Sequence, residues 1–158
     1  MPLKVRRVVT GHDPSGRAIV TIDEIARNLV SRRPGHAACV VWTTDASPAD
    51  NSGSADEALR PVGTTLANGT VFRIISFAPG VAPRMHRTSS IDYAIVMAGE
   101  IDMQLDDTEV HLQAGDVLVQ RGTIHNWVNR GTEPCVMGFV LVDAEPAVAG
   151  GATLQPTG

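Results

Sequence analysis

Three side chains that lie far apart in the sequence have types that could do chemistry together: His86, Asp92 and His125. Two imidazole nitrogens and one carboxylate make up the ligand set of facial-triad iron centres, which leave open positions on the ion for a substrate. Without a metal, either histidine could act as a general base, with Asp92 orienting it. We therefore expect these three residues to form a catalytic site if the fold brings them together.

The segments that must position these residues have the pattern of short β-strands. Ile101, Met103 and Leu105 alternate with polar residues, which is the period of a strand with one buried and one solvated face. The chain contains 15 glycines and 10 prolines, which mark frequent turns. About ten strands at this spacing predict an all-β antiparallel sandwich or barrel.

A chain of 158 residues is long enough to bury the core of one domain, which we place at residues 1–143. The barrel itself is expected at 69–143, after N-terminal strands and a long loop within 1–68. Small residues dominate 144–158, which we expect to form a flexible C-terminal tail.

Two segments of the N-terminal part carry more specific predictions. The capping-box pattern at 21–24 predicts a short helix that ends at Pro34 and Gly35. The polar loop at 45–63, with one helical turn near 54–59, is expected to be a lid over the pocket or an arm that crosses a dimer.

The bulk composition excludes several classes of partner. A net charge of −4 argues against nucleic acid and against an anionic membrane surface, because both require a basic face. No stretch approaches the ~20 apolar residues of a membrane span. We expect a cytoplasmic protein, in which Cys39 and Cys135 are buried, reduced thiols.

The first histidine lies in a pattern that resembles the first motif of the cupin superfamily. That motif runs Gly, five residues, His-x-His, three or four residues, Glu, six residues, Gly. Gly80, His86 and Gly99 match it in register. Thr88 stands in place of the second histidine, and Asp92 in place of the glutamate.

The second histidine lies in a pattern that resembles the second cupin motif, which runs Gly, five residues, Pro-x-Gly, two residues, His, three residues, Asn. Gly115, Gly122, His125 and Asn129 match this motif. One residue is missing before Gly122 and the proline is absent, Arg121 being the nearest residue. Seven positions agree over about 50 residues, which makes the combined pattern specific.

The resemblance implies a double-stranded β-helix, or jelly-roll, barrel that is often a homodimer and holds a metal or a small molecule in its mouth. It also implies that Asn129 is a structural residue bonded to the backbone.

Two alternatives follow for the metal. His86, Asp92 and His125 would bind a divalent ion, Fe, Mn, Zn or Ni, and leave about three positions open on an octahedral ion. Against this, the hydroxyl of Thr88 is a poor ligand and Asp92 reaches roughly 1.5 Å less far than glutamate. A metal-free site is the other alternative.

Three further residues are candidates for substrate binding. Arg84 has the same strand parity as His86 and could grip a substrate carboxylate or enolate. Tyr93 and Trp127 could line the pocket. His36 has no evident partner in the sequence, and His111 is expected on the solvated face of its strand.

We therefore expect an enzyme that acts on a small organic or phenolic substrate. The reaction is either a metal-assisted lyase or isomerase step, such as decarboxylation or dehydration, or a dioxygenation. A non-catalytic, metal-free cupin that binds a small molecule is the alternative, favoured by Thr88 and Asp92, whereas His86, His125 and Arg84 favour the enzyme.

Overall fold

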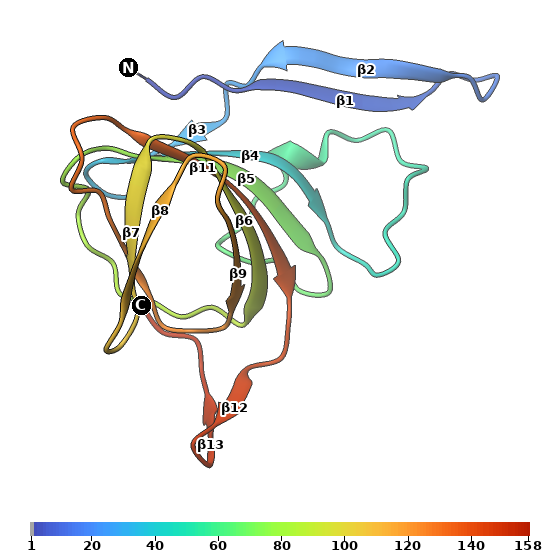
Figure 1. Cartoon of the computed structure of the whole chain (residues 1–158). Coiled ribbons are helices and arrows are strands. Elements are labelled where there is room, and N and C mark those ends of the chain that lie inside the picture. The colour runs from blue at the N-terminus through green and yellow to red at the C-terminus, as the bar shows by residue number, and fades with distance from the viewer. Residues whose placement is uncertain (1) are drawn as a thin grey trace.

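Two antiparallel β-sheets face each other in the computed structural model, which describes residues 2–158 (Figure 1). The large sheet has the strand order β3-β4-β5-β11-β6-β9. Its strands are β3 (Leu29–Val30), β4 (His36–Thr44), β5 (Thr70–Phe77), β6 (Ser90–Ala98), β9 (Val117–Arg121) and β11 (Cys135–Asp143). The small sheet has the order β10-β7-β8, with β7 (Glu100–Gln104), β8 (Glu109–Gln113) and β10 (Asn126–Val128). This arrangement confirms the all-β prediction.

The core lies between the two sheets because alternate residues of each strand point inward. On β6, Ala94 and Val96 are buried while Ile95 and Met97 are exposed. The centre of the core is aromatic, with ring centroids of Phe77, Trp127 and Phe139 at 5.8 to 6.4 Å from one another. The buried apolar cluster comprises Phe77, Val81, Ala94, Val96, Ile101, Met103, Leu112, Trp127, Cys135, Met137, Phe139 and Leu141.

An N-terminal hairpin of β1 (Arg6–His12) and β2 (Ala18–Ile25) projects beside β3 and β4, away from the barrel (Figure 1). The helix predicted after the capping-box pattern is therefore wrong. Residues 21–24 belong to β2, where the hydroxyl of Thr21 donates to the backbone oxygen of Val9 instead of capping a helix. Pairing with β1, which is distant in sequence, overrides the local helical signal.

The loop at 45–63 contains the predicted helical turn, as the 3-10 helix η1 (Glu57–Leu59). The loop docks on its own chain, since the hydroxyl of Thr43 donates to the backbone oxygen of Glu57 at 2.7 Å and Asp56 pairs with the buried Arg7 at 2.6 Å. Across residues 2–158, no helix is long and apolar enough to cross a membrane.

The C-terminal residues differ from the flexible tail that their composition predicts. They form a hairpin of β12 (Ala147–Ala149) and β13 (Ala152–Leu154), drawn below the barrel in Figure 1. Thr157 then makes two backbone hydrogen bonds to Arg87, at 2.9 and 3.0 Å. Backbone pairing, to which composition is insensitive, holds this segment against the barrel mouth.

Asn129 has the structural role that its motif position implies. Its amide donates to the backbone oxygens of Phe77 and Glu133, both at 2.9 Å, and its side-chain oxygen accepts from the backbone N–H of Gly131. One buried side chain thus ties the end of β5 to the loop between β10 and β11.

We expect Asn129→Ala to lower the free energy of unfolding by about 2 to 4 kcal/mol, because it leaves buried backbone groups unpaired. Urea denaturation followed by circular dichroism measures this change. Asn51→Ala, in the exposed loop, is the matched control and should change stability by less than about 0.5 kcal/mol. Equal effects of the two substitutions would contradict the role of Asn129.

Candidate functional site

His86 and His125 lie side by side, held by their own backbones. The N–H of His86 donates to the oxygen of His125 at 3.0 Å, and the N–H of His125 donates to the oxygen of His86 at 2.9 Å. The ring centroids are 4.2 Å apart, and both residues are buried. Because His86 precedes β6 and His125 precedes β10, this bridge links the two sheets.

Both imidazoles are oriented in the same way. The Nδ1 of His86 bonds the backbone oxygen of Arg84, and the Nδ1 of His125 bonds the backbone oxygen of Thr123, each at 2.9 Å. A carbonyl oxygen can only accept, so both rings carry their proton on Nδ1. The two Nε2 atoms therefore keep free lone pairs and make no hydrogen bond within residues 2–158.

The surroundings keep both rings neutral at pH 7. Burial, with smaller contributions from the charges of Arg84 and Arg33, lowers the pKa of His86 to about 4. Burial likewise lowers the pKa of His125. Neutral imidazoles with free Nε2 atoms can accept a proton or ligate a metal.

Asp92 is buried on the inward face of β6, where its backbone is paired with β11 at Leu141 and with β9 at Gln120. The hydroxyl of Ser90 donates to its Oδ1 at 2.6 Å and lies 2.8 Å from the hydroxyl of Thr88. Burial raises the pKa of Asp92, while the Ser90 hydrogen bond and the charge of Arg73 oppose that rise. The Asp92 carboxyl group is therefore the end of a hydrogen-bonded chain that runs through the hydroxyls of Thr88 and Ser90.

The predicted three-ligand metal centre is only partly assembled. Within residues 2–158, no group of three or more His, Cys, Asp or Glu side chains is placed to hold a metal ion. His86 and His125 fit a divalent ion by their tautomer and by the carbonyls that orient them, which is the usual arrangement behind metal-bound histidines. Asp92 does not join them.

The predicted substrate-binding residues have different positions. Trp127 is buried, with its ring 5.8 Å from that of His125, and so supports the histidine from the core. Tyr93 does not line the interior, which corrects that prediction. It follows the inward-facing Asp92 on β6, so it points to the outer face, where 51% of it is exposed.

Arg84 lies at the mouth of the barrel. Its Nη2 donates to the backbone oxygen of Gly158 at 2.8 Å, and its backbone N–H donates to the side chain of Asn126. A cavity of about 380 Å³ opens there and is lined by Thr64, Thr65, Arg84, Arg87, Thr88, Ser89, Asp143, Pro156, Thr157 and Gly158. Thr88 thus connects the cavity to the hydroxyl chain that ends at Asp92.

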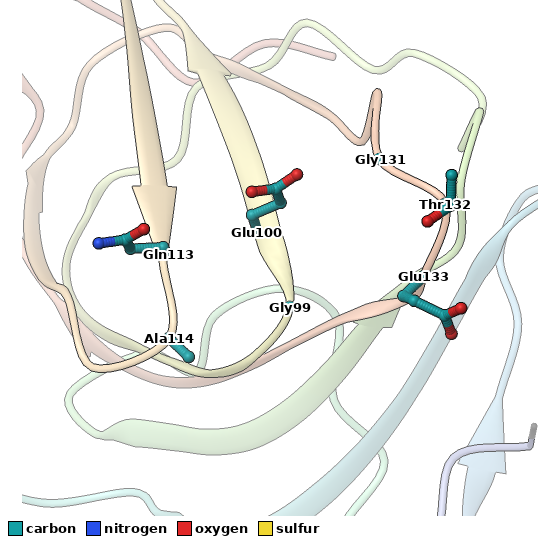
Figure 2. A pocket seen from close by; sticks show the side chains of 7 residues that line it. All are labelled: Gly99, Glu100, Gln113, Ala114, Gly131, Thr132 and Glu133. Atoms are coloured by element: carbon teal, nitrogen blue, oxygen red, sulfur yellow. The ribbon is translucent and has the colours of Figure 1, made fainter.

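A second cavity, of about 400 Å³, lies between the ends of β7 and β8 and the 131–133 loop (Figure 2). Glu100, Gln113 and Glu133 line it, and it contains none of the residues that the sequence suggests for chemistry. The cavity at the mouth is not lined by His86, Asp92 or His125 either, but it contains Arg84, a candidate substrate-binding residue that lies two residues before His86.

Three polar residues that the sequence motifs do not mark as functional point into the barrel. Arg73 is buried on β5, and its Nη2 donates to the backbone oxygens of Gly63 and Thr64 at 2.9 and 2.8 Å. His36 on β4 and Gln120 on β9 are also buried. A signal was present for Arg73, because it shares strand parity with the apolar Val71 and Phe77.

Comparison with known proteins identifies the family. The cupin-domain family model matches residues 73–142. The cupin-domain-containing oxidoreductase fogC of Aspergillus ruber is 35% identical over 162 residues, covering 96% of this chain and 79% of that protein. Phomopsin biosynthesis cluster protein C' of Diaporthe leptostromiformis is 38% identical over 159 residues, covering 94% of this chain and 83% of that protein. The chain belongs to the cupin family.

A solved structure agrees with this fold. A Klebsiella pneumoniae protein with a double-stranded β-helix domain superposes with a TM-score of 0.51 at 18% identity, covering 74% of this chain and 84% of the other. The predicted cupin jelly-roll fold is thereby confirmed.

The pKa values of the buried and the exposed histidines should be shifted in opposite directions, which one titration can measure. Burial and nearby arginines lower the pKa of His36 to about 4, as burial does for His86, whereas the Asp102 carboxylate raises the pKa of the exposed His111. We expect NMR titration of the Hε1 resonances to show His36 and His86 neutral at pH 6, when His111 is mainly protonated. The reverse order would contradict the buried placement of His36 and His86.

A pH dependence of stability follows from the same pKa values. In the unfolded chain His36 binds a proton below about pH 6.5, whereas in the folded protein it stays neutral down to about pH 4. Because the unfolded state binds more protons between these pH values, lowering the pH in this range favours unfolding. His36 should therefore cost about 1 to 3 kcal/mol of stability between pH 6.5 and 4. His36→Gln should flatten that slope relative to wild type, and an unchanged slope would contradict the shift.

Proposed function

We propose that this cupin is an oxidoreductase that oxidises a small organic molecule with dioxygen at the barrel mouth. The relatives named cupin-domain-containing oxidoreductases, at 32% to 35% identity over at least 90% of this chain, support the reaction class. The observation in this chain that carries the proposal is the buried pair of neutral imidazoles with two free Nε2 atoms.

Each residue of the site has a separate role in this proposal. His86 and His125 would hold a divalent ion through their free Nε2 atoms. A divalent ion, bound by these two nitrogens, would supply the reactivity toward dioxygen. Trp127 keeps the ring of His125 in place, and Arg84 lies where it can bind the substrate at the entrance.

A second candidate is a lyase or isomerase that works by proton transfer alone. It is favoured by one specific observation: Asp92 is bound by Ser90 and does not complete a three-ligand metal centre. In that case the histidines would act as bases, and the reaction would not consume oxygen.

We expect the double variant His86→Ala, His125→Ala to lose both bound divalent metal and activity while the barrel stays folded. Turnover should fall by at least about 100-fold whether the histidines hold the metal or act as bases, since a general base alone contributes about that factor. Elemental analysis of protein purified without added metal or chelator, oxygen uptake with a panel of small phenols and organic acids, and circular dichroism measure these three properties. His111→Ala, at an exposed histidine, is the matched control.

The outcomes separate the candidates. Metal content unchanged in the double variant would contradict the two histidines as ligands. Product formation without oxygen uptake would favour the lyase or isomerase. A wild-type protein that binds compounds from the panel but converts none would indicate a non-catalytic binding protein.

We also propose that the protein is a homodimer formed through the outer face of the large sheet. Tyr93 pairs with Val119 and Ile95 with Val117 across β6 and β9, and all four side chains are exposed on this face. The projecting β1–β2 hairpin exposes further apolar residues. A second copy related by two-fold symmetry would cover the β6–β9 face, which a monomer leaves in water.

Light scattering during size-exclusion chromatography should give twice the mass of one chain. Ile95→Arg with Val119→Arg should give a monomer, because it places charges within the apolar contact. Val148→Arg changes an even more exposed valine on the C-terminal hairpin and should leave the dimer intact. A wild-type monomer, or equal behaviour of the two variants, would contradict this interface.

A further inference from the structure

Four arginines around the barrel mouth have no acidic partner. The Nε of Arg33 donates to the backbone oxygen of Ala82 at 2.9 Å, the Nη2 of Arg84 to that of Gly158 at 2.8 Å, and Arg73 to two loop carbonyls. Arg32 makes a longer bond of 3.4 Å to a carbonyl. Within residues 2–158, none of the four forms an ion pair, whereas the paired arginines are Arg6, Arg7, Arg60 and Arg130.

The charges of these four arginines reach the same interior group. All four lower the pKa of His36, which lies on the inward face of β4. The backbone oxygen of Arg84 accepts the hydrogen bond from the Nδ1 of His86. The cluster therefore adjoins the histidine pair, although its arginines come from distant parts of the sequence.

The interior also contains polar atoms that nothing in the chain satisfies. The Nε of Arg73, the Nδ1 of His36 and the Oε1 of Gln120 are buried without a hydrogen-bond partner among the described residues. These residues are only 7%, 8% and 4% exposed. A buried polar group without a partner costs about 1 to 3 kcal/mol, so these atoms need a partner that the chain does not provide, such as water or the polar part of a bound molecule.

The negative charge available nearby is too small to balance the arginines. Asp92 is the buried carboxyl group that interacts with Arg73, and its pKa is raised by burial. Asp143 lines the mouth cavity, but it is exposed and accepts from the backbone N–H of Asn68. One buried carboxyl group and one exposed carboxylate face these four guanidinium groups and that of Arg87, which also lines the cavity, so the mouth is cationic in a protein whose net charge is −4.

We propose that the substrate of this site carries a carboxylate, which binds at the mouth to Arg84 with support from Arg33 and Arg73. This inference rests on the proposed function, since it names the class of molecule that the histidine pair acts on. The Nε and Nη1 of Arg84 make no hydrogen bond within residues 2–158, so its guanidinium has free donors for a carboxylate. The remainder of the molecule then lies beside the neighbouring His86.

Calorimetric titration with malonate tests this inference without turnover. Malonate carries two carboxylates, and malonamide is its neutral counterpart of similar size. We expect malonate to bind, malonamide not to bind, and Arg84→Gln or Arg33→Gln to weaken malonate at least about ten-fold. Arg17→Gln removes the same charge at the tip of the N-terminal hairpin and should leave binding unchanged.

The results separate this inference from the proposed function. It is overturned if malonate fails to bind, if malonamide binds equally well, or if Arg84→Gln and Arg17→Gln behave alike while thermal melts show both folded. Malonate binding in a protein that consumes no oxygen would support the carboxylate site and count against the oxidoreductase. Oxygen uptake with neutral compounds only, without malonate binding, would support the oxidoreductase and count against the carboxylate site.

Discussion

The two backbone hydrogen bonds between His86 and His125 are the contact on which the site depends. They join the segment that leads into the large sheet to the segment that leads into the small sheet, and they fix the two rings 4.2 Å apart. Two neutral imidazoles have little attraction of their own, so the backbone must provide this proximity. The same local geometry directs each Nδ1 to a carbonyl two residues earlier, which leaves both Nε2 atoms available.

The two departures from the cupin motif are connected to each other in space. Thr88 replaces a histidine and Asp92 replaces a glutamate, and Ser90 joins them by hydrogen bonds of 2.8 and 2.6 Å. A histidine at position 88 would replace the hydroxyl that Ser90 contacts, and a longer glutamate at position 92 would place its carboxyl group elsewhere. The pair of substitutions therefore exchanges two potential metal ligands for a hydroxyl chain that extends from the mouth cavity to a buried carboxyl group.

The sequence was sufficient for the barrel and for the convergence of the histidines, because strand periodicity and motif spacing are local patterns. It was insufficient where distant segments decide the outcome. Residues 21–24 have a helical capping pattern but pair with β1, and the tail is held by hydrogen bonds to Arg87 that its composition does not indicate. Tyr93 was assigned to the pocket although its neighbour Asp92 is the residue that points inward. The strand parity of Arg73 predicts that it points inward, but only the structure shows that three other arginines lie near it.

The positive charge of the arginines opposes protonation of the histidines, and an anionic substrate would reduce this opposition. Burial lowers the pKa of His86 to about 4, with smaller contributions from the charges of Arg84 and Arg33, and so makes it a weak base in the free protein. A bound carboxylate would neutralise part of this charge and raise the pKa of His86 toward the range in which an imidazole accepts protons efficiently. The same arginines would then stabilise the negative charge left on the substrate when its proton is removed. In the lyase or isomerase, where the histidines act as bases, the pair would therefore become effective mainly after the molecule it acts on has entered the mouth, which limits unwanted proton transfer in the empty barrel.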